Sequence, residues 1–128
     1  MICYSDLLGC EFKYGGRSKD EGFDCYGLAI EIYKRLGITL PDFGTAFQAH
    51  EQDKLVICGQ KSFVKLEKPE PYCIVCLVIR PPYVSHVGIV LPDLNKFLHT
   101  MHKIKVCVER LNSPQWNHRI RGFYKWQN

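Results

Sequence analysis

The sequence predicts an α+β domain in which N-terminal helices pack on a small antiparallel β-sheet. Residues 25–36 follow the spacing of an amphipathic helix, and apolar, β-branched runs separated by turn residues fill much of residues 72–108. A helical part followed by a run of strands is typical of α+β proteins. The chain has 128 residues and no internal repeat or linker, so we expect a single domain, residues 1–128.

The predicted helix has defined start and stop residues. Asp24 is a favourable N-cap, Gly37 suits the left-handed position just past a helix end, and Pro41 prevents continuation. The apolar face of this helix consists of Cys25, Leu28, Ala29, Ile32, Tyr33 and Leu36. Cys25 therefore lies in the first turn.

Cys25 is the candidate nucleophile because of that position. Free backbone amides and the positive end of the helix dipole stabilise a thiolate, so we expect a pKa below the usual value of about 8.5. The same amides can stabilise an oxyanion. The alternative is that Cys25 is a small buried core residue, as most free cysteines are.

Strands are expected in the second half of the chain. Residues 72–80 form a buried strand that Pro81 and Pro82 end, and residues 84–91 and 96–100 form a hairpin around the turn 92–95. Residues 104–108 alternate as a further strand. Between helix and strands, residues 46–57 are compatible with a short helix and residues 69–71 with a stiff approach to the sheet.

His86 is the candidate general base. Strand alternation places it on one face with Gly88, and a short hairpin loop places His99 on that face, directly across from His86 or one diagonal away. Gly88 is expected to leave space beside His86 for a backbone or a substrate. A thiol, a base and a polar group that orients the base make an activated nucleophile. Each histidine alone is equally well explained as a satisfied polar residue, so the hypothesis rests on the set Cys25, His86 and His99.

Several segments together resemble the NlpC family of papain-like cell-wall cysteine peptidases. They are Asp6–Arg17, Gly22–Leu28, Leu36–Pro41, Ser85–Val90 and Lys96–Thr100. The nearest likeness is to the compact catalytic modules of phage tails, which often finish with a segment similar to Arg121–Trp126. The resemblance implies a papain-like fold with Cys25 as nucleophile, His86 as general base and then acid, and His99 as the orienting third residue.

The resemblance also implies a substrate site. Tyr14, Asp24 and Tyr26 are expected at the oxyanion and substrate positions, with Tyr26 forming part of the groove wall where many members have serine. The implied reaction is hydrolysis of the D-γ-glutamyl bond to diaminopimelate or lysine in a peptidoglycan stem peptide. Two alternatives stay open: a structural tail or assembly component with little catalysis, and a thiol amidase or acyltransferase that acts on another acyl group.

The seven cysteines are an odd number without framework spacing, which favours a reducing compartment. Cys73 and Cys76 form a CxxC pair, but residues three apart on a strand face opposite ways and no second pair exists. We therefore expect core packing for both, and neither a metal nor a cofactor for the reaction.

Charge and targeting patterns restrict the partners further. The net charge of +4 suits an anionic envelope polymer or a solvated surface, and no basic-aromatic stripe indicates nucleic-acid binding. No stretch reaches membrane-spanning length. Leu7–Cys10 superficially matches a lipoprotein cleavage box, but no basic or apolar leader precedes it. We expect synthesis in the cytoplasm, with delivery to the cell wall by a virion tail, lysis or a secretion apparatus.

Overall fold

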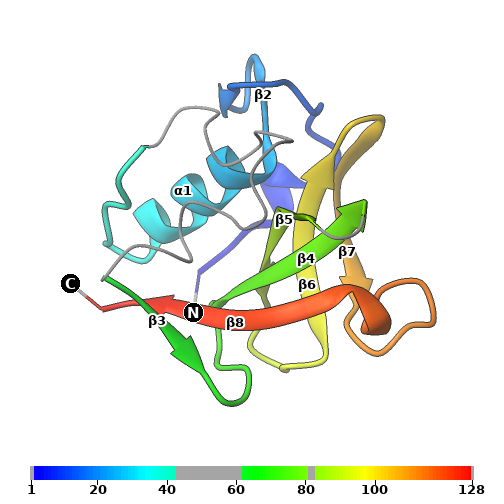
Figure 1. Ribbon diagram of the computed structural model, residues 1–128. Coiled ribbons are helices and arrows are strands. Elements are labelled where there is room, and N and C mark those ends of the chain that lie inside the picture. Colours follow the sequence, from blue (N-terminus) through cyan, green and yellow to red (C-terminus); the bar gives the residue numbers. More distant parts are fainter. Residues whose placement is uncertain (1, 43–61, 81–82, 128) are drawn as a thin grey trace.

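The computed structural model describes residues 2–42, 62–80 and 83–127 (Figure 1). The elements of the first part are the 3-10 helix η1 (Ser5–Leu7), the strands β1 (Arg17–Ser18) and β2 (Gly22–Phe23), and the helix α1 (Cys25–Arg35). The later elements are β3 (Phe63–Leu66), β4 (Ile74–Arg80), β5 (Tyr83–Val90), β6 (Lys96–Met101), β7 (Ile104–Arg110), the 3-10 helix η4 (Asn117–Arg119) and β8 (Ile120–Trp126).

The six later strands form one antiparallel sheet in the order β3-β8-β4-β5-β6-β7, and β1 and β2 form a separate small hairpin. Figure 1 shows α1 alongside the sheet, with β5 and β6 to the right of the helix. Apolar residues of α1 form one buried cluster with residues from one face of the sheet, which includes Leu28, Ile89 and Leu98. A second apolar cluster on the other face contains Val75, Phe97 and Trp116.

The helix begins and ends at the predicted residues. The Asp24 carboxylate accepts a hydrogen bond from the Gly27 amide at 2.6 Å, which is N-capping. Gly37 has a φ of +84°, and two bonds, from Gly37 N–H to the Lys34 carbonyl and from Ile38 N–H to the Tyr33 carbonyl, close a Schellman motif. Both cap predictions are confirmed.

The β5–β6 hairpin is also confirmed. Asp93 accepts hydrogen bonds from the Asn95 and Lys96 amides, which fixes the turn, and Val90 pairs with Phe97. The CxxC prediction holds as well. Cys73 and Cys76 are both buried, and they belong to the clusters on opposite faces of the sheet.

The predicted α+β class with an antiparallel sheet is confirmed, with two differences in its elements and one prediction that lies outside the described residues. The described N-terminal part contains one α-helix rather than several, and the sheet gains β3 and β8, which the sequence analysis did not predict. Both strands mix apolar and charged residues and are only partly buried, so their alternation is weak. The expected helix at residues 46–57 lies outside the described residues. No helix in the described ranges is both long and apolar enough to cross a membrane.

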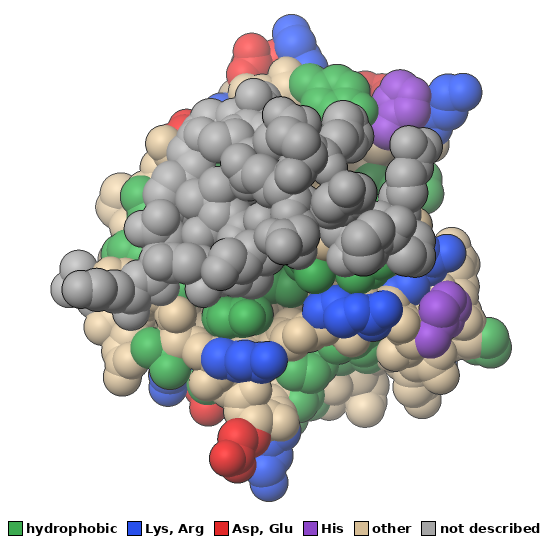
Figure 2. Space-filling view, in the orientation of Figure 1, with side chains coloured by type: hydrophobic (Ala, Val, Ile, Leu, Met, Phe, Trp, Pro, Cys, Tyr) green, Lys and Arg blue, Asp and Glu red, His purple; other side chains and the backbone are tan. Residues whose placement is uncertain are grey.

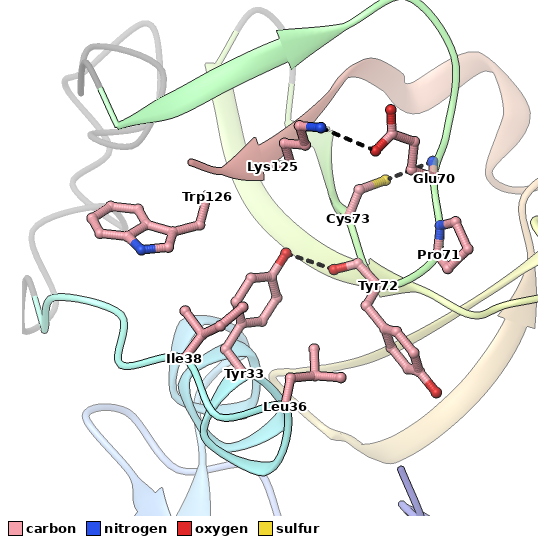
Figure 3. A pocket seen from close by; sticks show the side chains of 9 residues that line it. All are labelled: Tyr33, Leu36, Ile38, Glu70, Pro71, Tyr72, Cys73, Lys125 and Trp126. Carbon is pink, nitrogen blue, oxygen red and sulfur yellow. Dashed lines mark hydrogen bonds and ion pairs between the residues drawn. The ribbon is translucent and has the colours of Figure 1, made fainter. Parts of the chain in front are cut away.

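Two surface features lie on the β8 side of the molecule. Figure 2 shows Lys and Arg side chains across the part of this face over β8 and β4. A pocket of about 170 Å³ lies at the C-terminal end of α1, where Tyr33, Tyr72 and Trp126 line it and the Tyr33 hydroxyl donates to the Tyr72 carbonyl at 2.6 Å (Figure 3). Neither Cys25 nor His86 lines this pocket, so it is separate from the candidate site.

Candidate active site

Cys25 is the first residue of α1, and its side chain lies against β5. Only 2% of the residue is exposed, and it belongs to the cluster that also contains Val87. The backbone N–H of Val87 forms a hydrogen bond to the Cys25 sulfur. The structure therefore brings the thiol to the backbone of the residue that follows His86. Among the described residues, no hydrogen bond joins the sulfur to the His86 ring itself.

The expected low pKa of Cys25 is wrong for this structure. Burial raises the pKa of the thiol to about 12 and is the largest cause. The Val87 amide, and the Tyr26 and Cys25 amides of the first helical turn, act in the lowering direction but are outweighed. The helix-end effect is thus present, and desolvation exceeds it. At neutral pH the resting thiol is protonated.

His86 and His99 meet as the strand pattern predicted. Nε2 of His86 lies 2.8 Å from Nδ1 of His99, and the two residues are 3% and 0% exposed. Ile89 pairs with Leu98, and extending this register by one residue sets Gly88 opposite His99 and His86 one diagonal away. The expected space beside Gly88 is filled, however, because a Cβ there would meet the Phe97 ring at 2.7 Å.

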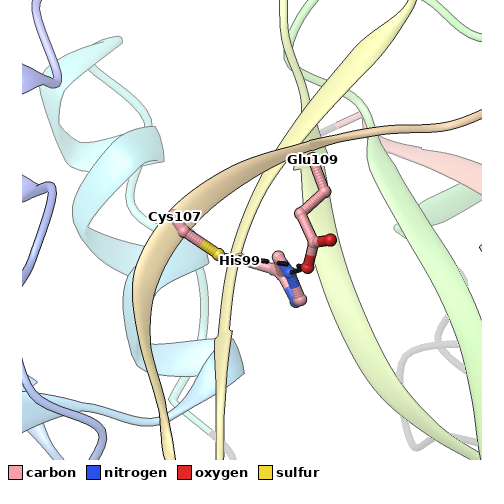
Figure 4. A group of neighbouring side chains, drawn as sticks. All are labelled: His99, Cys107 and Glu109. Carbon is pink, nitrogen blue, oxygen red and sulfur yellow. Dashed lines mark hydrogen bonds and ion pairs between the residues drawn. The ribbon is translucent and has the colours of Figure 1, made fainter. Parts of the chain in front are cut away.

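Glu109 extends this pair on the far side of His99. Its Oε2 lies 2.7 Å from Nε2 of His99 (Figure 4). The His99 imidazole therefore lies between His86 and the carboxylate. The sequence analysis missed Glu109. The pairing register of β6 with β7 would have identified it. His99 pairs with Cys107, and Glu109 lies two residues further along β7 on the same face.

The carboxylate determines where the ring protons lie. Because a carboxylate only accepts hydrogen bonds, Nε2 of a neutral His99 carries the proton and Nδ1 is an acceptor. Nε2–H of His86 then donates to Nδ1 of His99, and Nδ1 of His86 keeps a lone pair. This is the tautomer that a general base requires.

Burial keeps both rings neutral. It lowers the pKa of His86 well below 6.5, with the neighbouring His99 acting in the same direction. Burial also lowers the pKa of His99, although the bond and charge of Glu109 oppose that shift. At neutral pH the site therefore holds a protonated thiol and two uncharged imidazoles.

Trp116, which the sequence analysis did not identify, encloses the two histidines. Its ring lies 5.0 Å from that of His99 at 81° and 6.2 Å from that of His86. Phe97 packs against His99 from β6 at 4.8 Å. Trp116 is 2% exposed, so this aromatic cover keeps water away from the His86–His99 bond.

Asp24 positions the loop in front of the helix. Oδ1 accepts from Gly27 N–H and from Nη1 of Arg17 at 2.8 Å, and Oδ2 accepts from Gly15 N–H at 3.0 Å. The loop packs so closely on α1 that a Cβ on Gly27 would collide with the Gly16 carbonyl. Asp24 is fully buried, and these bonds hold the loop on the start of α1; its substrate-binding role stays a prediction.

The two predicted tyrosines differ in environment. Tyr14 is 62% exposed beside the glycine loop and stacks with His102 at 6.1 Å. This leaves its hydroxyl accessible, and its oxyanion role stays a prediction. Tyr26 is fully buried, and its hydroxyl donates to the Pro41 carbonyl at 2.7 Å. The Tyr26 ring therefore packs in the core, and its part in the wall of the substrate groove stays a prediction.

The chain is similar in sequence to one known enzyme and in structure to several known proteins. The chain is 27% identical over 122 residues to the gamma-DL-glutamyl hydrolase of Bacillus subtilis, spanning 94% of this chain and 27% of that protein. An NlpC/P60 family protein from Bacillus cereus superimposes with a TM-score of 0.69 at 23% identity, covering 95% of this chain and 37% of the other. The NlpC/p60 domain of the peptidoglycan hydrolase SagA gives a TM-score of 0.61 at 16% identity, covering 93% and 89%.

These structural similarities concern the fold, and the chain corresponds to only about a quarter of the length of the Bacillus subtilis enzyme. The sequence model of the NlpC/P60 family matches residues 9–125, which is nearly the whole chain. The protein belongs to the NlpC/P60 family.

Proposed function

We propose that this protein is a cysteine peptidase of the cell wall that cleaves the D-γ-glutamyl bond to diaminopimelate or lysine in peptidoglycan stem peptides. The observation that carries the proposal is the buried chain of hydrogen bonds from His86 through His99 to Glu109, together with the Cys25 thiol at the backbone of Val87, the residue after His86. A purely structural domain has no need for a base that is desolvated and held in one tautomer.

The reaction begins with proton transfer from the Cys25 thiol to Nδ1 of His86. The sulfur then attacks the carbonyl carbon, and amides of the first turn of α1 stabilise the oxyanion, with the Tyr14 hydroxyl as a further donor. His86 protonates the leaving amine, and a thioester forms. His86 next removes a proton from water, which hydrolyses the thioester and restores the thiol.

The resting geometry makes the first transfer dependent on substrate. In the resting protein the Cys25 thiol is neutral and is hydrogen-bonded to the Val87 backbone N–H rather than to the His86 imidazole. Catalytic hydrogen bonds commonly tighten only once substrate is bound. When His86 takes the proton, both of its nitrogens carry hydrogens. The Glu109 carboxylate then stabilises the imidazolium through His99, so Glu109 is a positioning residue.

The γ-glutamyl bond is supported by the comparisons. The Bacillus subtilis relative is by name a γ-glutamyl hydrolase, and one structural relative is a domain of a peptidoglycan hydrolase. The net charge of +4 and the basic side chains over β8 suit an anionic polymer (Figure 2). Delivery by a phage tail, lysis or a secretion apparatus is part of the same proposal.

A second candidate substrate follows from the name of that relative. A γ-linked glutamyl polymer offers the same γ-glutamyl acyl group, joined to glutamate instead of a diamino acid, and a higher negative charge than a stem peptide. The same thiol and histidines would act on it, because the catalytic residues recognise the carbonyl and not the rest of the chain.

Both candidates are tested by one digestion. Defined muropeptides and a γ-linked glutamyl polymer are incubated with wild type and with Cys25→Ala, and the products are identified by mass spectrometry. The proposal expects muropeptide products with a free amino group on the diamino acid, from wild type only. Cleavage of the polymer alone would select the second candidate. Equal cleavage by Cys25→Ala, or no cleavage of either substrate by folded wild type, would contradict the proposal.

A further inference from the structure

Three potential metal ligands lie together at the outer end of the histidine pair. They are Nε2 of His99, Sγ of Cys107 and a carboxylate oxygen of Glu109, all within 4.8 Å of one another (Figure 4). Sγ of Cys107 is 4.0 Å from Oε2 of Glu109, which is 2.7 Å from Nε2 of His99. Cys107 takes no part in the reaction proposed above.

This set matches the preferences of zinc. Imidazole nitrogen, thiolate sulfur and carboxylate oxygen bind Zn²⁺ at about 2.0 to 2.3 Å, which places tetrahedral ligand atoms about 3 to 4 Å apart. The observed separations need only small side-chain movements to reach those values. Cys107 and Glu109 share one face of β7, and His99 is the cross-strand partner of Cys107, so the backbone already aligns the three.

The site is accessible from one side. His99 is fully buried, but Cys107 is half-buried and the Glu109 side chain is 25% exposed. β7 is also an edge strand of the sheet. An ion can therefore enter past Cys107 and Glu109, and a water molecule can take the fourth position.

We propose that His99, Cys107 and Glu109 form a zinc-binding site whose occupation switches off His86. The inhibitory part rests on the proposed function, whereas zinc binding itself does not.

Zinc reverses the tautomers on which the base depends. A metal on Nε2 of His99 leaves the ring proton on Nδ1, which then donates to Nε2 of His86. The His86 proton consequently lies on Nδ1, and that nitrogen can no longer accept the thiol proton. The Cys107 thiol loses its proton to solvent on binding, and each histidine keeps one, so one proton is released per zinc ion.

Cobalt(II) provides a readout that is independent of activity. Reduced protein is titrated with Co²⁺, and a thiolate-to-metal charge-transfer band together with tetrahedral d–d absorption is expected at one equivalent. Competition with a chromophoric chelator then gives the Zn²⁺ affinity. Loss of a residue that merely supports a ligand costs about 10- to 100-fold in metal affinity, so Cys107→Ser, which removes the thiolate ligand, is expected to cost at least about 100-fold.

Two control variants identify the sulfur that binds. Cys25→Ala and Cys3→Ser should retain the band and the affinity, because Cys25 is the catalytic thiol and Cys3 is an exposed cysteine elsewhere. If the band disappears in Cys25→Ala and persists in Cys107→Ser, the metal binds at the nucleophile and the proposal is wrong. Absence of any tetrahedral band in wild type also overturns it.

Inhibition is measured on the substrate that wild type cleaves. Saturating Zn²⁺ should reduce wild-type turnover by about 100-fold or more, the usual contribution of a general base, and should leave Cys107→Ser active. Equal inhibition of both proteins refutes the switch even if cobalt binds. If no substrate is cleaved, the function proposed above fails, and the cobalt titration still decides the metal site.

Discussion

Nε2 of His99 lies 2.7 Å from Oε2 of Glu109, on the side of the ring away from His86. This contact links a half-buried carboxylate on β7 to a buried imidazole on β5 through one intervening ring. It makes Glu109 the residue that sets the proton positions of both histidines, and the candidate site therefore has four members rather than three.

Glu109→Gln should lower kcat by about 10- to 100-fold, the range seen when the partner of a functional histidine is removed. Glutamine keeps an acceptor but loses the charge that stabilises the His86 imidazolium, so Glu109→Ala should be slower still, and KM should change little in either variant. Steady-state kinetics on the cleaved substrate measure both effects. Glu70→Gln, at an exposed glutamate that pairs with Lys125, is the matched control. Full activity in Glu109→Ala would rule out the positioning role.

The proposed roles of the histidines predict graded losses. His86→Ala should reduce kcat/KM by about 10⁴-fold, because the proton acceptor itself is gone. His99→Ala should lose less, about 100-fold, because it orients the base without transferring the proton to the substrate. Circular dichroism confirms that each variant is folded before its kinetics are compared. A larger loss for His99→Ala than for His86→Ala would reverse the assigned roles.

The buried thiol should react slowly in the resting protein. Burial raises the pKa of Cys25 to about 12, whereas a hydrogen bond from Ser5 lowers the pKa of the exposed Cys3 below 9.0. At pH 6 to 7, alkylation of Cys3 should exceed that of Cys25 by more than about 100-fold, because only the thiolate reacts. Peptide mapping after timed labelling gives the two rates. Preferential labelling of Cys25 at pH 6 would show that a thiolate already exists at rest.

Acid should destabilise the fold through the two histidines. Their pKa values are lowered in the folded protein, so the unfolded chain binds protons below about 6.5 while the native site does not. The free energy of unfolding should then fall by up to about 1.4 kcal/mol per histidine for each pH unit below 6.5, until the folded pKa is reached. Denaturant unfolding at several pH values measures this. His86→Gln should reduce the slope of stability against pH, and an unchanged slope in His86→Gln would contradict the account.

Asp24 should matter for stability more than its small side chain suggests. Asp24→Ala removes the helix N-cap, worth about 0.5 to 2 kcal/mol, and also the partner of Arg17, so a loss of about 2 kcal/mol or more is expected. Asp24→Asn keeps the cap acceptor and should lose less. Asp20→Ala, at an exposed position, should stay within about 0.5 kcal/mol of wild type. Denaturant midpoints that rank Asp24→Asn below Asp24→Ala would contradict the capping role.

The sequence was sufficient where local periodicity determines the structure. The 3.6-residue pattern and the caps Asp24 and Gly37 define α1, and the two-residue pattern with a short turn brings His86 to His99. Each of these predictions needs only neighbours in the chain or one hairpin. The strands β3 and β8 were missed because their mixed, partly buried sequences show no clear alternation.

The features of the site that the sequence did not predict depend on contacts between distant elements. Glu109 requires the register of β6 against β7, and Trp116 reaches the histidines from a loop that has no pattern of its own. The pKa of Cys25 was predicted in the wrong direction because the helix end is a local feature, whereas burial depends on how α1 packs against β5.

The most direct test of the central claim is to trap the acyl-enzyme. Wild type is mixed with a defined stem peptide, quenched in acid during turnover, and measured by intact-mass spectrometry followed by peptide mapping. The account predicts a mass increase equal to the acyl fragment that ends in D-glutamate, attached to Cys25 as a thioester. An adduct on another residue, or turnover that persists in Cys25→Ala without any adduct, would contradict it.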